Sequence, residues 1–169
     1  MAAVAGIAWY WIQTTSAERD FMALAEEGRD NLDAVQSHPN RGRSHFSPGG
    51  SYNYGEPFPT SGPHDPIWLD PGFYHAAMPA TRIVHSLEHG NVVIYYDRPG
   101  DDVMEMIEDW VGLYPGQWDG LIATPSPGLG SAVMLNAWTK SLELDPFDPI
   151  AAAAFIDTYR GRGPENPVR

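Results

Sequence analysis

The chain has 169 residues, enough for one domain with a buried core, and its 43% hydrophobic and 12% aromatic content argues against intrinsic disorder. Its 10 Lys plus Arg stand against 22 Asp plus Glu, and the formal net charge of −12 excludes the basic face that nucleic acid or an anionic membrane surface requires. There are no cysteines, which excludes disulfides, iron–sulfur clusters and thiolate zinc sites.

The first stretch, residues 1–12, is uncharged and apolar, and it carries Trp9, Tyr10 and Trp11 where an interfacial aromatic belt would fall. It is shorter than the roughly 20 residues that span a bilayer, and no basic residue precedes it as in a signal peptide. Three interpretations remain open: part of a longer anchor with a misassigned start, a short interfacial or partner-docking helix, or a core helix. We treat residues 1–15 as an anchor remnant or docking helix.

A helix is expected from Ser16 to about Val35. Ser16 can cap it, and Glu18 and Asp20 lie in the first turn, where the helix dipole favours anions. Only a narrow apolar stripe runs along this helix, formed by Phe21, Leu24, Ala25, Leu32 and Val35. We therefore expect residues 16–37 to form a helical stalk.

Hydrophobic periodicity disappears over residues 38–79, which hold four of the six histidines and eight of the 16 prolines. A loop of this length in a compact domain is either functional or disordered. Its aromatic residues and its Pro/Gly turns favour a long ordered loop, with a short strand at Ser51–Tyr54.

The remainder alternates strands and helices. The expected elements are a buried strand at Val92–Tyr96, a helix from Asp102 to Tyr114 with an Asp102/Glu105 capping box, strands at Leu121–Thr124 and Ser131–Trp138, and a helix from Asp148–Pro149 to Tyr159. This order predicts an α+β fold with a mixed or antiparallel sheet of three to five strands and helices on one face. Residues 38–165 would form a single globular domain, with residues 166–169 as a tail.

The string His85-Ser-Leu-Glu88-His89 matches H-x-x-E-H, the inverted zinc-protease motif. On a helix, its two histidines would share one face and bind zinc, with the glutamate as base. However, Gly90 and the β-branched run after it indicate a tight turn into a strand, and no helix offering a third ligand is evident. We therefore interpret the motif as a turn that presents side chains.

A looser metal site is a stronger hypothesis. Four histidines lie beside Gly or Pro turns, where the backbone is held and the rings can converge: His45, His64, His85 and His89. Imidazole ligands suit zinc, copper, nickel and iron. We predict that these four side chains bind copper or zinc.

Neighbouring residues bear on this prediction. Asp65 and Glu88 are available to accept ring N–H groups, which would hold the tautomers of the ligands. A thioether from Met78 or Met134 would favour Cu(I). The alternative is that the histidines bond loop carbonyls and stabilise a region with few strands.

Four sequence blocks, GRSH (42–45), PTSGPH (59–64), VHSLEHGNVVIYY (84–96) and FIDTYRGRGPE (155–165), closely resemble domain-of-unknown-function family 3105. The resemblance covers roughly residues 38–165 and picks out the same four histidines. Members of that family are bacterial and archaeal, typically with one N-terminal membrane anchor before an extracytoplasmic domain. The resemblance implies that residues 1–15 are the remains of an anchor, and it carries no established activity.

Together with this resemblance, which implies the location, the sequence favours an extracytoplasmic domain, periplasmic or at the cell surface, that is membrane-tethered or assembly-bound and binds a transition metal in a binding, delivery or sensing role. Its expected partner is a membrane or a membrane-protein complex contacted through residues 1–15, with self-assembly as a further option and no nucleic acid. Two alternatives stay open. One is a structural or accessory subunit docked by its N-terminal helix, and the other is a metal-dependent hydrolase with Glu88 as base.

Overall fold

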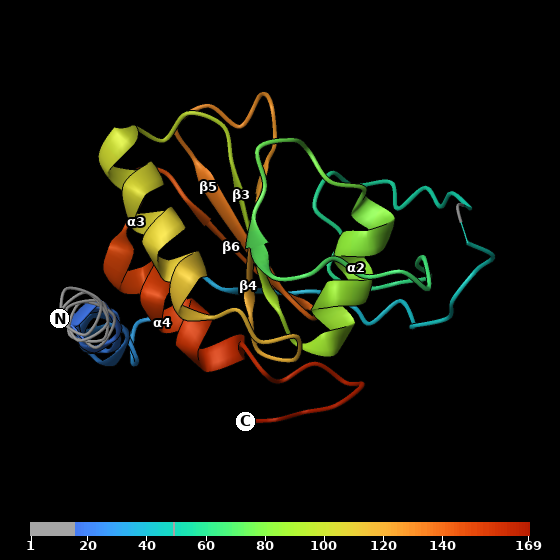
Figure 1. Ribbon diagram of the computed structural model, residues 1–169, viewed down its shortest axis with the longest axis horizontal. Helices are drawn as coiled ribbons and strands as arrows, with labels where there is room; N and C mark the ends of the chain where they lie inside the picture. The colour runs from blue at the N-terminus through green and yellow to red at the C-terminus, as the bar shows by residue number, and fades with distance from the viewer. Residues whose placement is uncertain (1–15, 49) are drawn as a thin grey trace, which may run out of the picture.

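The computed structural model describes residues 16–48 and 50–169, and across them the chain forms a six-stranded mixed sheet with helices on both faces (Figure 1). Residues 16–27 are helical. The elements that follow are β1 (Gln36–Ser37), β2 (Gly72–Phe73), α2 (Ala80–His89), β3 (Val92–Tyr96), α3 (Asp101–Leu113), β4 (Leu121–Pro125), β5 (Val133–Ala137), β6 (Lys140–Leu144) and α4 (Pro149–Tyr159).

The strand order is β1-β6-β5-β3-β4-β2, which places β3 inside the sheet. β3 runs parallel to β4 and antiparallel to β5. All five of its residues are buried because both faces of the sheet are covered. Alternate side chains point to opposite faces, so Val92 and Ile94 join one apolar cluster while Val93 and Tyr95 join another.

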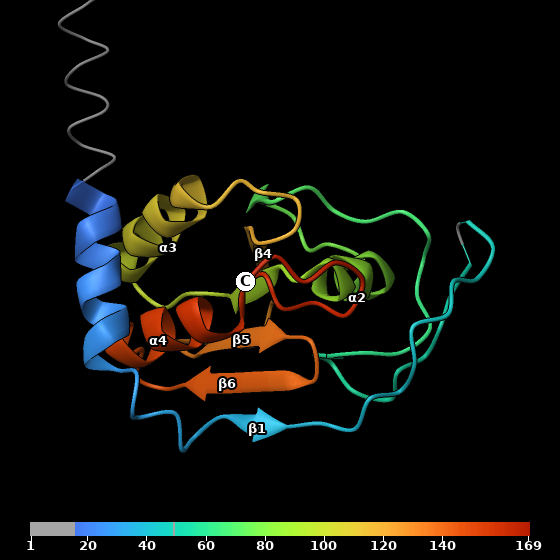
Figure 2. The same cartoon turned by 90° about the horizontal axis from the view of Figure 1, so that it is seen from below.

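One face of the sheet is covered by α3 and α4, and the helix at residues 16–27 lies on the outer side of these two helices (Figure 2). Phe21 of that first helix packs edge-on against Trp110 and Tyr114 of the α3 end, with ring centroids 5.2 Å apart in both pairs. α4 begins as predicted, because the Asp148 side chain accepts the Ile150 N–H at 2.9 Å and Pro149 follows the cap.

The opposite face is covered by α2. Ile83 and Leu87 of this helix pack on Val93, Tyr95 and Ile122 of the sheet. The α+β class and the mixed sheet are therefore confirmed. The sheet has six strands, more than the three to five expected, and the placement of the helices on one face is wrong for α2.

The expected tight turn at H-x-x-E-H is also wrong, because the motif lies in the last turns of α2. Gly90 is the helix C-cap, with φ of 107°, and its amide bonds back to the Leu87 carbonyl. The glycine ends a helix that precedes it, and the apolar run of β3 begins two residues later. A glycine before a β-branched run is compatible both with a tight turn and with the end of a helix. The packing of Ile83 and Leu87 against the sheet favours the helix.

The N-terminal helix ends at residue 27, short of Val35, and Gln36–Ser37 instead pair with β6. Phe21 and Ala25 are buried in the main core, so this part of the chain is packed against the domain and does not form a separate stalk. Residues 51–54 form no strand.

The cap of α3 and the strand β6 also differ from what the sequence predicted. α3 is capped by Gly100 with no side-chain hydrogen bond, so the Asp102/Glu105 capping box is wrong. The strands expected near Leu121 and Ser131 are confirmed as β4 and β5, and β6 was missed.

The apolar residues 1–15 lie outside the described residues, and so do the interpretations placed on them. Within residues 16–48 and 50–169, no helix combines the length and the apolar content needed to cross a membrane.

Candidate metal centre

Backbone pairing within the long loop brings His45 and His64 together. The Phe46 N–H donates to the His64 carbonyl at 3.1 Å, and the His64 N–H donates to the Ser44 carbonyl at 3.0 Å. These bonds make His45 and His64 partners in an isolated parallel bridge. Partners in such a bridge direct their side chains to the same side, and the two ring centroids are 4.8 Å apart.

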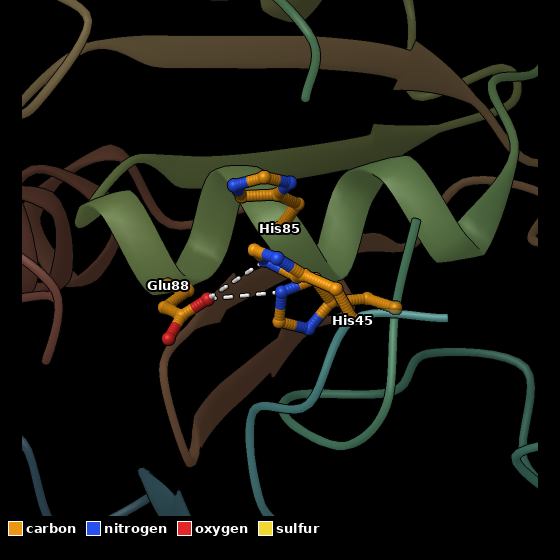
Figure 3. A group of neighbouring side chains, drawn as sticks. His45, His85 and Glu88 are labelled. Atoms are coloured by element: carbon orange, nitrogen blue, oxygen red, sulfur yellow. Dashed lines mark ion pairs between the residues drawn. The ribbon is translucent and has the colours of Figure 1, made fainter. Parts of the chain in front are cut away.

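Helix α2 supplies the other half of the site. His85, Glu88 and His89 stand three and four residues apart, so they share one helical face. Figure 3 shows His85 and Glu88 on α2 facing His45 from the loop. The ring centroid of His85 lies 4.8 Å from that of His45 and 4.9 Å from that of His64, so the three rings form a nearly equilateral triangle.

Ser86 fastens the loop to α2. Its Oγ accepts the Leu69 N–H at 2.9 Å and donates to the Leu69 carbonyl at 3.1 Å. Nearby, the Asp65 N–H donates to the Thr81 carbonyl at 3.3 Å. These bonds hold the loop over the polar face of α2 and bury it.

Two groups of side chains offer ligand atoms within 4.8 Å of one another. We name the first the inner group, formed by His45, His64, His85 and Glu88, and the second the outer group, formed by His85, His89 and Glu165. Three of the four predicted histidines, His45, His64 and His85, thus lie together with Glu88 in the inner group. The fourth, His89, lies in the outer group, which also contains His85. Glu165 was missed as a site residue, although it ends the sequence block FIDTYRGRGPE, where the signal lay.

Hydrogen bonds to the backbone decide the tautomers of His64 and His85. Their Nδ1 atoms lie 2.8 Å from the carbonyl oxygens of Gly62 and Asp65, respectively. A carbonyl only accepts, so each Nδ1 carries the proton and each Nε2 keeps a lone pair. The expected role of Asp65 is thus performed by its carbonyl, while its carboxylate accepts the Ile67 N–H at 2.9 Å.

His64 Nε2 lies 2.9 Å from Glu88 Oε2, and the two side chains are 0% and 5% exposed. Burial lowers the pKa of His64 below its usual range and raises the pKa of Glu88 above its usual range. A neutral Nε2 lone pair and a carboxylate oxygen repel each other at this distance unless a cation lies between them. The pair therefore calls for a shared proton or a metal ion.

His89 differs from the other two buried histidines. Its Nδ1 has no hydrogen-bond partner among the residues the structure describes, and its Nε2 lies 3.1 Å from Glu165 Oε2. The ring proton is best placed on Nε2, where Glu165 accepts it. Burial lowers the pKa of His89 to about 4, and the ring packs 4.4 Å from the Trp118 ring and 5.1 Å from the Trp68 ring. His89 thus holds Glu165 in place.

The C-terminal segment delivers Glu165 by packing against the end of α2 (Figure 2). The Gly161 N–H donates to the Gly90 carbonyl at 2.8 Å, and the Glu165 N–H donates to the Glu88 carbonyl at 3.3 Å. A Cβ at Gly163 would collide with the Glu88 carbonyl oxygen and the Gly90 nitrogen, so only glycine allows this approach.

The site reaches the surface at two points. The side chains of His45 and Glu165 are 46% and 41% exposed, while the remaining members of both groups are buried. A hollow of about 350 Å³ is lined by Pro66, Ile67, Trp68 and Asp70, and Trp68 also packs on His85 and His89. An ion or small ligand can therefore reach the histidines from solvent.

The two methionines considered as soft ligands lie elsewhere. Met78 and Met134 pack against the apolar cluster between α2 and the sheet, which contains Leu87 and Val93. The donors that converge in both groups are imidazole nitrogens and carboxylate oxygens.

Searches among curated proteins and among solved structures find no match. A family model described as "Protein of unknown function (DUF3105)" matches residues 45–169, which is 125 of the 169 residues and includes both groups. The chain therefore belongs to the DUF3105 family.

Proposed function

We propose that this domain binds one divalent transition metal ion, zinc or Cu(II), through His45, His64, His85 and Glu88. The observation that supports this proposal most is the 2.9 Å approach of His64 Nε2 to Glu88 Oε2 in a buried setting. A metal ion bound to both atoms replaces their repulsion with two bonds. Two backbone carbonyls already hold the ring protons of His64 and His85 away from the centre, as is usual for metal-binding histidines.

The donor set narrows the choice of metal. Three imidazoles and one carboxylate suit Zn²⁺ in a four-coordinate site, and imidazole-rich sites also bind Cu(II). Cu(I) prefers sulfur ligands, and the methionines proposed for that role pack in the apolar cluster. Zinc and Cu(II) are therefore the ions to test first.

We propose Glu88 as the fourth ligand in place of His89. Glu88 Oε2 lies 3.9 Å from His45 Nε2 as well as 2.9 Å from His64 Nε2, and Glu88 belongs to the same group as the three rings. His89 directs its Nε2 to Glu165 instead.

The test is metal analysis of protein purified without a histidine tag, stripped with EDTA and reloaded with Zn²⁺ or Cu²⁺. We expect one ion per chain in the parent protein, loss of stoichiometric binding in His85→Ala, whose ring belongs to both groups, and weaker binding in His64→Ala. His75→Ala is the matched control, because His75 is exposed and belongs to neither group. A parent protein that retains no ion after reloading and desalting would overturn the proposal.

A binding, delivery or sensing role is supported by the solvent access at His45 and Glu165, through which an ion can enter and leave. The location outside the cytoplasm, tethered to a membrane or held in an assembly, stays a proposal that rests on the family resemblance. Fractionation of cells that express the full chain, probed by an antibody to the domain, would test it; recovery in the cytoplasmic fraction would contradict it.

A metal-dependent hydrolase is the second candidate, and α2 favours it. H-x-x-E-H does lie on a helix, and Glu165 Oε2 lies 3.1 Å from His89 Nε2 and 4.0 Å from His85 Nε2. Two histidines and a carboxylate form a ligand set of catalytic zinc sites, which keep one position for water.

This candidate predicts hydrolysis of some member of an ester, peptide and phosphoester panel by the zinc-loaded protein. Glu88→Gln would abolish that activity, and Glu143→Gln, a change on an exposed β6 residue, would leave it intact. No hydrolysis above the metal-stripped protein would remove the hydrolase from consideration.

A further inference from the structure

We propose that a single bound ion has two alternative positions, an inner position in the inner group and an outer position in the outer group, and that it passes between them with His85 bound throughout. This inference rests on the proposed metal-binding function and specifies it as ion transfer.

His85 belongs to both groups, and this makes the two positions exclusive. Its Nδ1 is engaged by the Asp65 carbonyl at 2.8 Å, so only the Nε2 lone pair is available to a metal. That Nε2 lies 4.0 Å from Glu165 Oε2, and His85 also offers a ring nitrogen within 4.8 Å of the other inner ligand atoms. One lone pair binds one ion, so His85 serves the inner or the outer position at any moment.

The inner position binds more tightly. Its buried rings, His64 and His85, already present Nε2 lone pairs. At the outer position, His89 must give up its Nε2 proton and carry a proton on Nδ1, a buried atom with no partner among the described residues. An unsatisfied buried donor is costly, so we expect the outer position to bind at least about fivefold more weakly.

The outer position offers a second route for exchange, beside the one at His45. Glu165 comes from the C-terminal segment, its side chain is 41% exposed, and a carboxylate attracts cations. Trp68, which packs on both His85 and His89, also lines the neighbouring hollow. An ion leaving the inner position can therefore be held by Glu165 and His89 before it departs to solvent or to an acceptor.

The experiment uses the full chain loaded with less than one equivalent of Cu²⁺ and read by electron paramagnetic resonance. We expect a major species with three nitrogen ligands and a minor species with two. Glu88→Gln weakens the inner position and should enrich the two-nitrogen species, and Glu165→Gln should remove it. Glu143→Gln is the matched control and should show the parent spectrum.

Kinetics give an independent readout, because transfer of Cu²⁺ to excess EDTA can be followed by recovery of tryptophan fluorescence. We expect Glu165→Gln to slow transfer several-fold, Glu165→Asp to restore part of the rate, and Glu143→Gln to have no effect. Circular dichroism would confirm that each variant is folded.

The outcomes separate the two proposals. Absence of stoichiometric Cu²⁺ in the parent protein overturns the metal-binding function itself. One tightly bound ion with a single spectrum, unchanged in spectrum and transfer rate by Glu165→Gln, overturns the second position alone. Two ions bound at once per chain would overturn the exclusive use of His85.

Discussion

His64 Nε2 and Glu88 Oε2 face each other at 2.9 Å, buried between the long loop and α2, although the His64 proton is held on Nδ1 by the Gly62 carbonyl. The loop supplies the first atom and α2 the second. Their meeting is the feature on which metal binding is proposed, and it is open to direct test.

In a Glu165→Gln background, which lacks the outer position, Glu88→Gln should lower zinc affinity by more than about 100-fold, because loss of an outer-shell partner alone costs 10- to 100-fold and Glu88 is proposed as a direct ligand. In the metal-free protein the new amide can donate to His64 Nε2, so stability should be kept. Competition with a zinc chelator and thermal melts would measure the two effects. Unchanged zinc affinity would contradict Glu88 as a ligand.

Ser86→Ala should loosen the loop from α2. The change leaves the Leu69 N–H buried without its acceptor, and we expect a loss of about 1–3 kcal/mol in the free energy of unfolding. Urea denaturation of the metal-free protein would measure it. Ser131→Ala, which removes an exposed hydroxyl bonded to Asp145, is the control, and an equal loss in both variants would show that Ser86 has no special role.

Gly163→Ala should displace the C-terminal segment, since its Cβ would meet the backbone of Glu88 and Gly90. Overpacking of this kind costs about 1–3 kcal/mol. Gly112→Ala should instead stabilise the protein by about 0.5–1 kcal/mol, because Gly112 lies in α3 with open space at its Cβ. Thermal melts compare the two, and a destabilisation of similar size in both would refute the close approach at Gly163.

The buried histidines should make the metal-free protein less stable in mild acid. The pKa of His89 is lowered to about 4, and burial also lowers the pKa values of His64 and His85. Between pH 6.5 and about 4 the unfolded chain therefore binds more protons at these residues than the folded chain, so stability falls as the pH falls.

The pKa shift of Glu88 has the opposite effect on the pH dependence of stability. Its raised pKa means that the folded state keeps a proton that the unfolded state releases, so its contribution decreases as the pH rises above 4.5. Because three histidines destabilise the folded state in acid and one glutamate has the opposite effect, we expect a net loss of stability in acid. Urea denaturation in EDTA at pH 7.0 and pH 5.5 measures it, and His89→Gln should reduce the difference; equal stability at the two pH values would count against neutral buried histidines.

Local chemistry was enough to predict several elements. The run Val92–Tyr96 is apolar throughout and forms β3, and Asp148 followed by Pro149 starts α4 by a side-chain cap. The Gly90 signal was ambiguous because glycine ends helices and also forms turns. Burial of Ile83 and Leu87 against the sheet, a contact between distant segments, resolved it in favour of α2.

The sequence by itself determined the family and the α+β class and singled out the four histidines, because these depend on residue identity, blocks and short-range pattern; it assigned Glu88 a different role and missed Glu165. Only the tertiary structure decided how the donors are used. The backbone carbonyls of Gly62 and Asp65 orient the His64 and His85 rings, and every residue has such a carbonyl. The close approach of Gly163 to α2 brings Glu165 to His89. Ring tautomers and facing lone pairs arise from such long-range backbone contacts, which residue types do not encode locally.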